Sequence, residues 1–182
     1  MLIALIAGVV AALVARLRGG SLESLAATPF RWPLLLWTSL IAQIAFGAWD
    51  PEWLGSTGGL AVILATNVLV AAFLAFNRRL PGMVLAAVGT MLNVLVIAVN
   101  GAMPVALGAA QIAGAGVRDL GIKHEILDAE TRLPWLGDVI PVPGLRVLIS
   151  VGDVLLAIGI AWLVYRRTMA GAGEASEPAA SG

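Results

Sequence analysis

Residues 134–144 read PWLGDVIPVPG, and residues 145–165 continue as LRVLISVGDVLLAIGIAWLVY. The first part is rich in turn-forming residues and contains Trp135, Asp138 and three prolines. The second part predicts an apolar helix that carries one carboxylate, Asp153, well inside its length. Because an ionisable group within a membrane span is energetically costly, we interpret Asp153 as a candidate functional residue.

The composition of the whole chain indicates a membrane protein. Its 182 residues are 60% hydrophobic and only 12% charged, whereas soluble domains are about 25% charged. Several apolar runs approach the roughly 20 residues that a helix needs to cross the hydrocarbon layer. The predicted fold class is therefore all-α, an integral membrane bundle, because a β-barrel would alternate polar and apolar residues in shorter segments.

Five apolar segments predict five transmembrane helices. They span approximately residues 2–15, 33–49, 58–76, 82–99 and 145–165, and with their connections they form one membrane domain over residues 1–167. Tryptophans at both ends of the second segment are typical of an aromatic belt. Residues 168–182 are mostly Gly, Ala, Ser, Glu and Pro, so we expect a disordered tail.

The arginines between these segments predict the orientation of the chain. They gather in the connections on one side and after the last segment: Arg16, Arg18, Arg31, Arg78, Arg79, Arg166 and Arg167. The positive-inside rule places that side in the cytoplasm. We therefore expect the N-terminus outside and the C-terminus inside a bacterial plasma membrane.

Residues 100–144 predict a long external loop between the fourth and fifth helices. Such a length is uncommon for a connection without structure of its own, so we expect the loop to be partly structured. Residues 104–116 are almost all small or apolar but too few for a full span, which favours a re-entrant or interface-lying segment. Residues 117–130 are mixed in polarity and predict a short surface helix.

The few polar side chains inside the predicted helices have similar expected depths. At about 1.5 Å per residue, Gln43 and Asn93 lie about 9 Å, Asp153 about 12 Å and Asn67 about 13 Å inside the outer helix ends. We therefore expect these four side chains to share one layer in the outer half of the membrane. For the amides we favour hydrogen bonds that only hold helices together, at about 0.6 kcal/mol each, whereas for Asp153 we favour a functional site.

The same reasoning extends the candidate site toward the loop. Arg146, Ser150 and Asp153 are expected on one face of the last helix, at spacings of four and three. The ligand-binding candidates are Asp153, Asn93, Asn67, Gln43, Asn100, Asp138 and Arg146.

Several classes of chemistry are excluded or unsupported. The chain has no cysteine, which excludes disulfides, thiol nucleophiles and thiolate metal sites. The net charge is zero with no long basic run, so we expect no nucleic-acid partner. His124 lies near Glu125 and Asp128, but a lone loop histidine is usually solvated, and its spacing to Asp128, Glu130 and Asp138 matches no metal motif. We assign no catalytic residue, metal ligand or cofactor.

Four motifs resemble an uncharacterised bacterial membrane-protein family, the domain-of-unknown-function family numbered 5317. They are RLRGGSL at residues 16–22, NGAMPV at 100–105, LGDVIP at 136–141 and SVGDVLLAIG at 150–159. Because that family has no assigned activity, the resemblance implies no catalytic role. It singles out as motif positions Asn100, Gly101, Met103, Pro104, Gly137, Asp138, Pro141, Gly152 and Asp153.

Three functional hypotheses follow for this membrane-embedded chain. The first is a non-enzymatic protein that binds a small molecule, ion or lipid in an outward-facing polar pocket. The second is an intramembrane enzyme that acts on a lipid-linked substrate and uses Asp153 or Asp138 as acid or base. The third is a scaffold subunit that packs against another membrane protein or a second copy of itself. An enzyme would bring carboxylates together in one pocket, whereas a scaffold would have no pocket.

Overall fold

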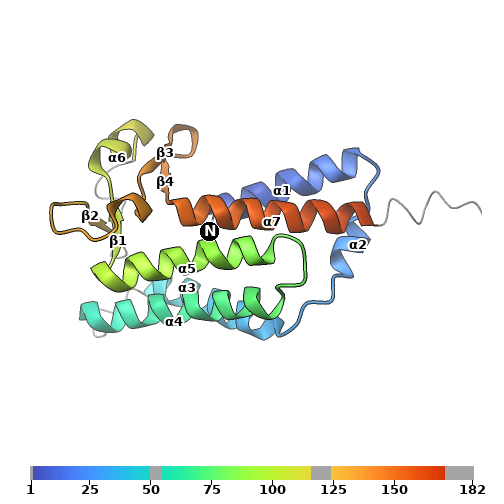
Figure 1. Ribbon diagram of the computed structural model, residues 1–182, viewed down its shortest axis with the longest axis horizontal. Coiled ribbons are helices and arrows are strands. Elements are labelled where there is room, and N and C mark those ends of the chain that lie inside the picture. The colour runs from blue at the N-terminus through green and yellow to red at the C-terminus, as the bar shows by residue number, and fades with distance from the viewer. Residues whose placement is uncertain (1, 50–54, 116–123, 171–182) are drawn as a thin grey trace, which may run out of the picture.

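The computed structural model describes residues 2–49, 55–115 and 124–170. In these ranges the chain is mostly helical and contains five long helices (Figure 1). They are α1 (Leu2–Leu17), α3 (Pro33–Trp49), α4 (Gly55–Phe76), α5 (Met83–Asn100) and α7 (Val151–Met169). Two stretches of helix, Thr57–Phe76 and Met83–Asn100, are both long and apolar enough to cross a membrane.

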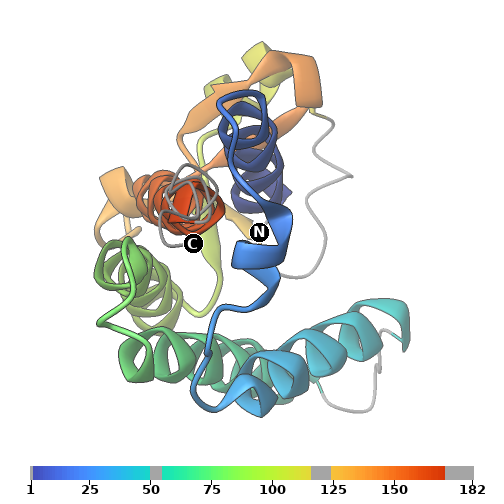
Figure 2. The ribbon, with the colours of Figure 1, turned by 90° about the vertical axis from the view of Figure 1, so that its right-hand side faces the viewer.

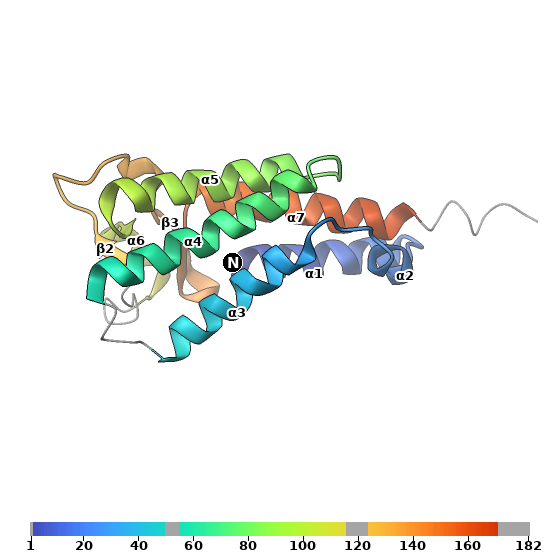
Figure 3. The ribbon, with the colours of Figure 1, turned by 90° about the horizontal axis from the view of Figure 1, so that it is seen from below.

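The long helices form an arc whose order differs from their order in the chain. α1 packs on α7, α7 on α5, α5 on α4, and α4 on α3 (Figure 2). The first and last long helices are therefore neighbours. Toward its C-terminal end α3 diverges from α4 (Figure 3), so the two helices are farthest apart near Trp49.

Glycines allow α5 and α7 to cross in close backbone contact. A Cβ atom added to Gly89 would collide with the carbonyl oxygen of Gly152, and a Cβ added to Gly159 would lie 2.5 Å from the carbonyl oxygen of Gly82. Gly82, which caps the start of α5, and Gly89 are seven residues apart, as are Gly152 and Gly159 on α7, and seven residues make about two turns. This interface is of the small-residue type that lets membrane helices approach closely.

Polar contacts hold several connections together at one end of the bundle. Arg18 donates a hydrogen bond to the Tyr165 hydroxyl at 2.9 Å, and Arg167 donates one to the Thr28 hydroxyl at 3.0 Å. The short helix α2 (Leu22–Ala26) packs against α7 at this end. The arginine-bearing connections after α1 and before α3 therefore lie beside the C-terminal end of α7.

A compact group of short elements covers the other end of the bundle (Figure 1). It contains β1 (Met103–Val105), α6 (Leu107–Ala113), β2 (His124–Ile126), η3 (Pro134–Leu136), β3 (Ile140–Val142), η4 (Pro143–Leu145) and β4 (Val147–Ile149). β1 pairs in parallel with β2, and β3 pairs antiparallel with β4. We call these elements, which lie within residues 103–115 and 124–149, the loop module.

The loop module agrees with the predicted loop only in part. β1 packs against α5, whereas α6 lies on the β3–β4 hairpin and buries Ala109, Ala110 and Ala113. The apolar segment 104–116 thus contributes buried residues within its described part. The predicted surface helix over residues 117–130 is wrong at 124–126, which form β2, and residues 117–123 lie outside the described ranges.

The start and end of the last helix also differ from the prediction. α7 begins at Val151 and not at Leu145, because residues 143–149 form a 3-10 turn and the strand β4. Arg146 has a left-handed backbone (φ 53°) in this turn, so it does not share a helix face with Asp153. The helix continues to Met169 and so includes the first two residues of the predicted disordered tail, 168–182, of which residues 171–182 lie outside the described ranges.

Candidate functional site

Asp153 and Ser150 form a capping box at the start of α7. The Ser150 hydroxyl accepts a hydrogen bond from the Asp153 backbone N–H at 3.0 Å, and Asp153 Oδ2 accepts one from the Ser150 backbone N–H at 3.3 Å. Together they satisfy two backbone N–H groups that the first turn would otherwise leave without partners. Asp153 is therefore a first-turn residue and not a carboxylate deep inside a helix.

Asn93 on α5 connects this cap to the neighbouring helix. Its side-chain amide donates to Asp153 Oδ1 at 3.1 Å, and its Oδ1 accepts from the fully buried Ser150 hydroxyl at 2.8 Å. The close approach of Gly152 to Asn93 leaves no room for a side chain at position 152. Asn93, Ser150 and Asp153 thus form one network across the α5–α7 crossing.

A cavity of about 240 Å³ lies where this network meets the loop module. Its polar lining residues come from helices α3, α4, α5 and α7 and from the loop module: Gln43, Thr66, Asn67, Asn93, Asp138 and Asp153. Four apolar residues complete the lining: Ile63, Ile97, Met103 and Leu148. We call it the Asp153 cavity. The structure thus brings Gln43, Asn67, Asn93 and Asp153 together, although the depth argument misplaced Asp153 on its helix.

Asp138 reaches the same cavity from the loop module. It forms an isolated β-bridge with Val105, its backbone N–H donates to the Pro104 carbonyl at 2.8 Å, and its side chain is 6% exposed. A Cβ on the preceding residue, Gly137, would lie 2.5 Å from the same Pro104 carbonyl. A larger residue at position 137 would therefore push the Asp138 segment away from β1.

The two amides on α3 and α4 bond within or close to their own helices. Gln43 donates to the Ser39 hydroxyl at 3.1 Å, and Ser39 donates in turn to the Thr66 carbonyl on α4 at 2.8 Å. Asn67 donates to the Ile63 carbonyl one turn earlier at 2.8 Å. Thr66 also donates to carbonyls of its own helix. The Ser39–Thr66 bond joins α3 to α4.

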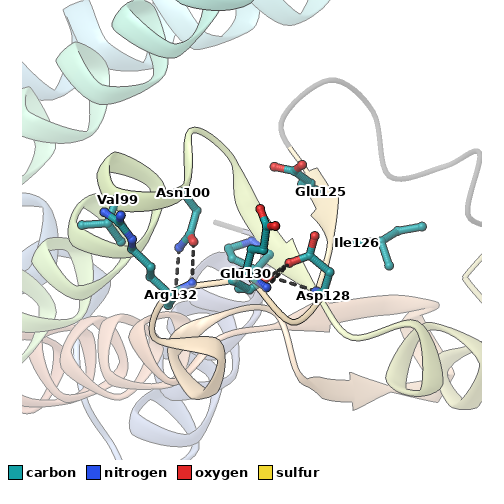
Figure 4. A pocket seen from close by; sticks show the side chains of 9 residues that line it. Val99, Asn100, Glu125, Ile126, Asp128, Glu130 and Arg132 are labelled. Carbon is teal, nitrogen blue, oxygen red and sulfur yellow. Dashed lines mark hydrogen bonds between the residues drawn. The ribbon is translucent and has the colours of Figure 1, made fainter.

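Asn100 lies outside the lining of the Asp153 cavity and forms hydrogen bonds that hold the loop module. It lines a second cavity of about 290 Å³ in the loop module, together with Glu125, Asp128, Glu130 and Arg132 (Figure 4). The Asn100 amide donates to the Arg132 carbonyl at 2.9 Å, and its Oδ1 accepts from the Arg132 backbone N–H at 2.8 Å. Asn100 thus ties the loop to the C-terminal end of α5.

Asn77, at the end of α4, makes the same pattern of bonds at the opposite end of the bundle. Its Oδ1 accepts from the Arg31 backbone N–H at 2.8 Å, and its amide donates to the Arg31 carbonyl at 2.9 Å. Each of the two asparagines also donates to the carbonyl four residues earlier. Sequence reasoning missed Asn77 and gave Asn100 as a ligand-binding candidate. An asparagine at the predicted end of an apolar helix was the available signal.

The turn after β2 is stabilised by Asp128. Its Oδ1 accepts from the Thr131 hydroxyl and from the Glu130 backbone N–H, each at 2.9 Å. The hydrogen bond from the Thr131 side chain, followed by that from the Glu130 backbone, lowers the pKa of the Asp128 carboxyl below its ordinary value of 3.8. Within the described residues, no group of three His, Cys, Asp or Glu side chains is placed to hold a metal ion.

Two remaining candidates stand apart from the Asp153 cavity. Arg146 is exposed in the turn between β3 and β4 and does not line the cavity. His124 belongs to β2, where it pairs with Met103 of β1. The sequence also held a signal for the capping box, since Ser150 is followed three residues later by the acid Asp153. We interpreted this pair as part of a helix face instead.

Comparisons with known proteins give a family but no activity. The model of a family of unknown function, DUF5317, matches residues 27–165. An uncharacterised protein of Thermotoga maritima is 32% identical over 141 residues, which cover 74% of this chain and 68% of that protein. No solved structure matches.

Proposed function

This chain belongs to the DUF5317 family of unknown function, and from its geometry we propose that it is a membrane protein that binds a small molecule, ion or lipid in the Asp153 cavity. The observation that carries this proposal is the convergence of polar side chains from five separate parts of the chain on one cavity. Cavities with a few converging polar groups among apolar ones are typical of ligand sites.

The membrane part of the proposal rests on apolar surface. Only 33% of Thr57–Phe76 and 39% of the Met83–Asn100 helix is buried, whereas the core helix of a soluble protein is mostly buried. α1 also exposes large apolar side chains, including Leu5 at 65% and Leu13 at 59%. A surface of this kind is stable against lipid and not against water.

In this proposal, all five long helices cross the membrane. α7 has the required length but carries Asp153, Arg166 and Arg167 at its two ends, where charged groups reach the membrane interface. α1, with 16 residues, is about 24 Å long, and Arg16 at its end extends its reach by snorkelling. The arginine-bearing end is cytoplasmic, and the loop module with the Asp153 cavity faces outward.

Binding without catalysis suits the bonds that Asp153 makes. Both of its carboxylate oxygens accept hydrogen bonds that hold the start of α7 and its contact with α5. One observation favours the enzymatic alternative: Asp138 and Asp153 line the same cavity, as expected for an acid and base pair. A phosphate group would meet two carboxylates there and no Lys or Arg from the described parts of the chain, which counts against a phosphate-linked substrate.

Native mass spectrometry of protein purified with its native lipids tests the proposal. We expect a retained molecule in the wild type that is reduced in Asn67→Leu, because Asn67 lines the cavity but bonds only to its own helix. Gln111→Leu is the matched control, since Gln111 is exposed on α6. Equal retention by both variants would contradict binding in the Asp153 cavity. Recovery of a chemically altered ligand after incubation would favour the enzyme.

A further inference from the structure

The lining of the Asp153 cavity is rich in hydrogen-bond acceptors and poor in hydrogen-bond donors, and its charged side chains are negative. Two carboxylates, Asp138 and Asp153, contribute to it, and among the residues that the structure describes no Lys, Arg or His lines it. In a partly desolvated cavity, such a lining favours a ligand of positive charge over an anion.

The amide groups that line the cavity direct their hydrogen-bond donors elsewhere. Because the Ser39 hydroxyl donates to Thr66, its interaction with Gln43 requires the Gln43 NH₂ as donor. The Asn67 NH₂ points to the Ile63 carbonyl. The Asn93 NH₂ faces Asp153, which can only accept when ionised. These contacts fix the orientation of all three amides.

Some oxygen atoms of the lining can therefore accept further hydrogen bonds from a ligand. Among the residues that the structure describes, the side-chain carbonyl oxygens of Gln43 and Asn67 accept no hydrogen bond from the chain itself. Each oxygen of Asp153 accepts one bond, although a carboxylate oxygen has two lone pairs. A ligand with several N–H donors would complete this set.

The size and the apolar part of the lining limit the ligand further. A cavity of about 240 Å³ is smaller than the roughly 300–1,000 Å³ of pockets for drug-sized ligands, so it suits a small molecule or the end of a larger one. Ile63, Ile97, Met103 and Leu148 offer no partner to the hydration shell of a metal ion. They suit a short carbon chain.

We infer that the Asp153 cavity takes a primary ammonium group on a short carbon chain, with the nitrogen toward Asp138 and Asp153. This inference rests on the proposed binding function and names the chemical class of its ligand. The ammonium belongs either to a free amine or to the amine headgroup of a lipid, since both present three N–H donors and one positive charge.

Thermal unfolding in detergent with four small probes tests the charge requirement. The probes are propylammonium, 1-propanol, propionate and potassium ion. The first three are similar in size but differ in charge and in hydrogen-bond donors, and potassium ion carries a positive charge without a carbon chain. A ligand that binds only the folded state raises the unfolding temperature. We expect a rise with propylammonium that exceeds the rise with each of the other three at equal concentration and ionic strength.

Variants test whether propylammonium stabilises the protein by binding in the Asp153 cavity. Asp138→Asn should weaken propylammonium binding about tenfold, because it removes a charge-assisted hydrogen bond. Glu23→Gln removes an exposed carboxylate on α2, at the other end of the bundle, and should leave the binding unchanged. If Asp138→Asn does not fold, Asn67→Leu is the deciding variant. It removes one hydrogen-bond acceptor from the cavity and should therefore weaken the binding of propylammonium.

Nanodiscs containing either phosphatidylethanolamine or phosphatidylcholine distinguish the two sources of the amine. Stabilisation by the primary-amine lipid, lost in Asp138→Asn, would identify a lipid headgroup, and stabilisation by propylammonium alone would identify a free amine. An equal response to propanol, or a larger one to propionate, would overturn the ammonium inference and leave the binding proposal standing. No response to any probe or lipid, with no molecule retained in native mass spectrometry, would overturn both.

Discussion

At the scale of single residues, Asp153 stabilises the start of a helix while it lines a cavity. A carboxylate in the first turn interacts favourably with the helix dipole and with free N–H groups, so its position requires no compensating partner charge. Its bonds to Ser150 and Asn93 join the N-terminal end of α7 to the middle of α5. Substitutions at position 153 should therefore affect folding as well as binding.

Asp153→Asn should lower the free energy of unfolding by about 1–2 kcal/mol. An amide at this position places an NH₂ group against one of two donors, the Ser150 N–H or the Asn93 NH₂. Thermal unfolding in detergent measures the effect, with Glu23→Gln as the control for loss of an exposed carboxylate. An unchanged unfolding temperature would show that these hydrogen bonds contribute nothing to stability.

Asp128 gives the turn at residues 128–131 a dependence on pH. Because its pKa is lowered in the folded state by Thr131 and Glu130, the Asp128 carboxylate stabilises the turn fully above its ordinary pKa of 3.8. This stabilisation is lost as the pH falls through the lower pKa of the folded state. We expect amide exchange at Glu130 and Thr131, normalised for intrinsic rates, to increase relative to the rest of the chain across this acid range. Asp128→Asn should show the faster exchange already at neutral pH, and equal protection in both proteins would contradict this account.

At the scale of elements, the crossing of α5 and α7 positions the Asp153 cavity. Glycine pairs bring the two backbones into contact, and Asn93 can reach the cap of α7 only because the helices are so close. The close fit at Gly152 excludes even one methyl group. The spacing between the helices therefore sets both the packing and the geometry of the polar network.

Gly152→Ala should destabilise the protein by about 1–3 kcal/mol or more, because the new methyl group collides with Asn93 Oδ1 and lies 2.5 Å from the Gly89 carbonyl. Gly108→Ala is the matched control. Gly108 is helical, and a Cβ there meets nothing within 4 Å, so alanine should be neutral or stabilising by up to about 1 kcal/mol. Equal unfolding temperatures for the two variants would contradict the close crossing of α5 and α7.

At the scale of the whole molecule, the first and last long helices pack together and the loop module covers the opposite end of α7. α1 contacts α7 along Gly8, where a Cβ would lie 3.4 Å from Ile160. Bonds of Arg18 and Arg167 fix the end where the arginines gather. The two ends of the bundle thus differ in charge, which is the basis of the proposed orientation.

Single cysteines at Ala170 and Glu130 should react from opposite sides of the membrane. Both positions are exposed, one at the arginine-bearing end and one in the loop module, and the chain has no cysteine of its own. In intact cells, a maleimide that reaches the periplasm but not the cytoplasm should label Glu130→Cys and spare Ala170→Cys. Permeabilised cells should show labelling of both. Labelling of both in intact cells would contradict an odd number of crossings between a cytoplasmic and an external end.

The sequence by itself determined the helical class and most helix positions. Runs of apolar residues bounded by glycine, proline or arginine are local signals, so four of the five long helices begin and end within about three residues of their predicted limits. The family was also recognisable from four short motifs, and the match over residues 27–165 confirms it.

Only the tertiary structure decided what Asp153, Arg146 and Asn100 do. The short apolar run Val147–Ile149 suits a helix and a strand equally, and pairing of β4 with β3 selects the strand. This choice moves the helix start to Val151, places Asp153 in a cap and removes Arg146 from its helix face. Likewise, Asn100 binds the backbone of a residue 32 positions away, and Asp138 reaches the cavity through a bridge to Val105. Such contacts depend on how distant segments meet, which no local pattern encodes.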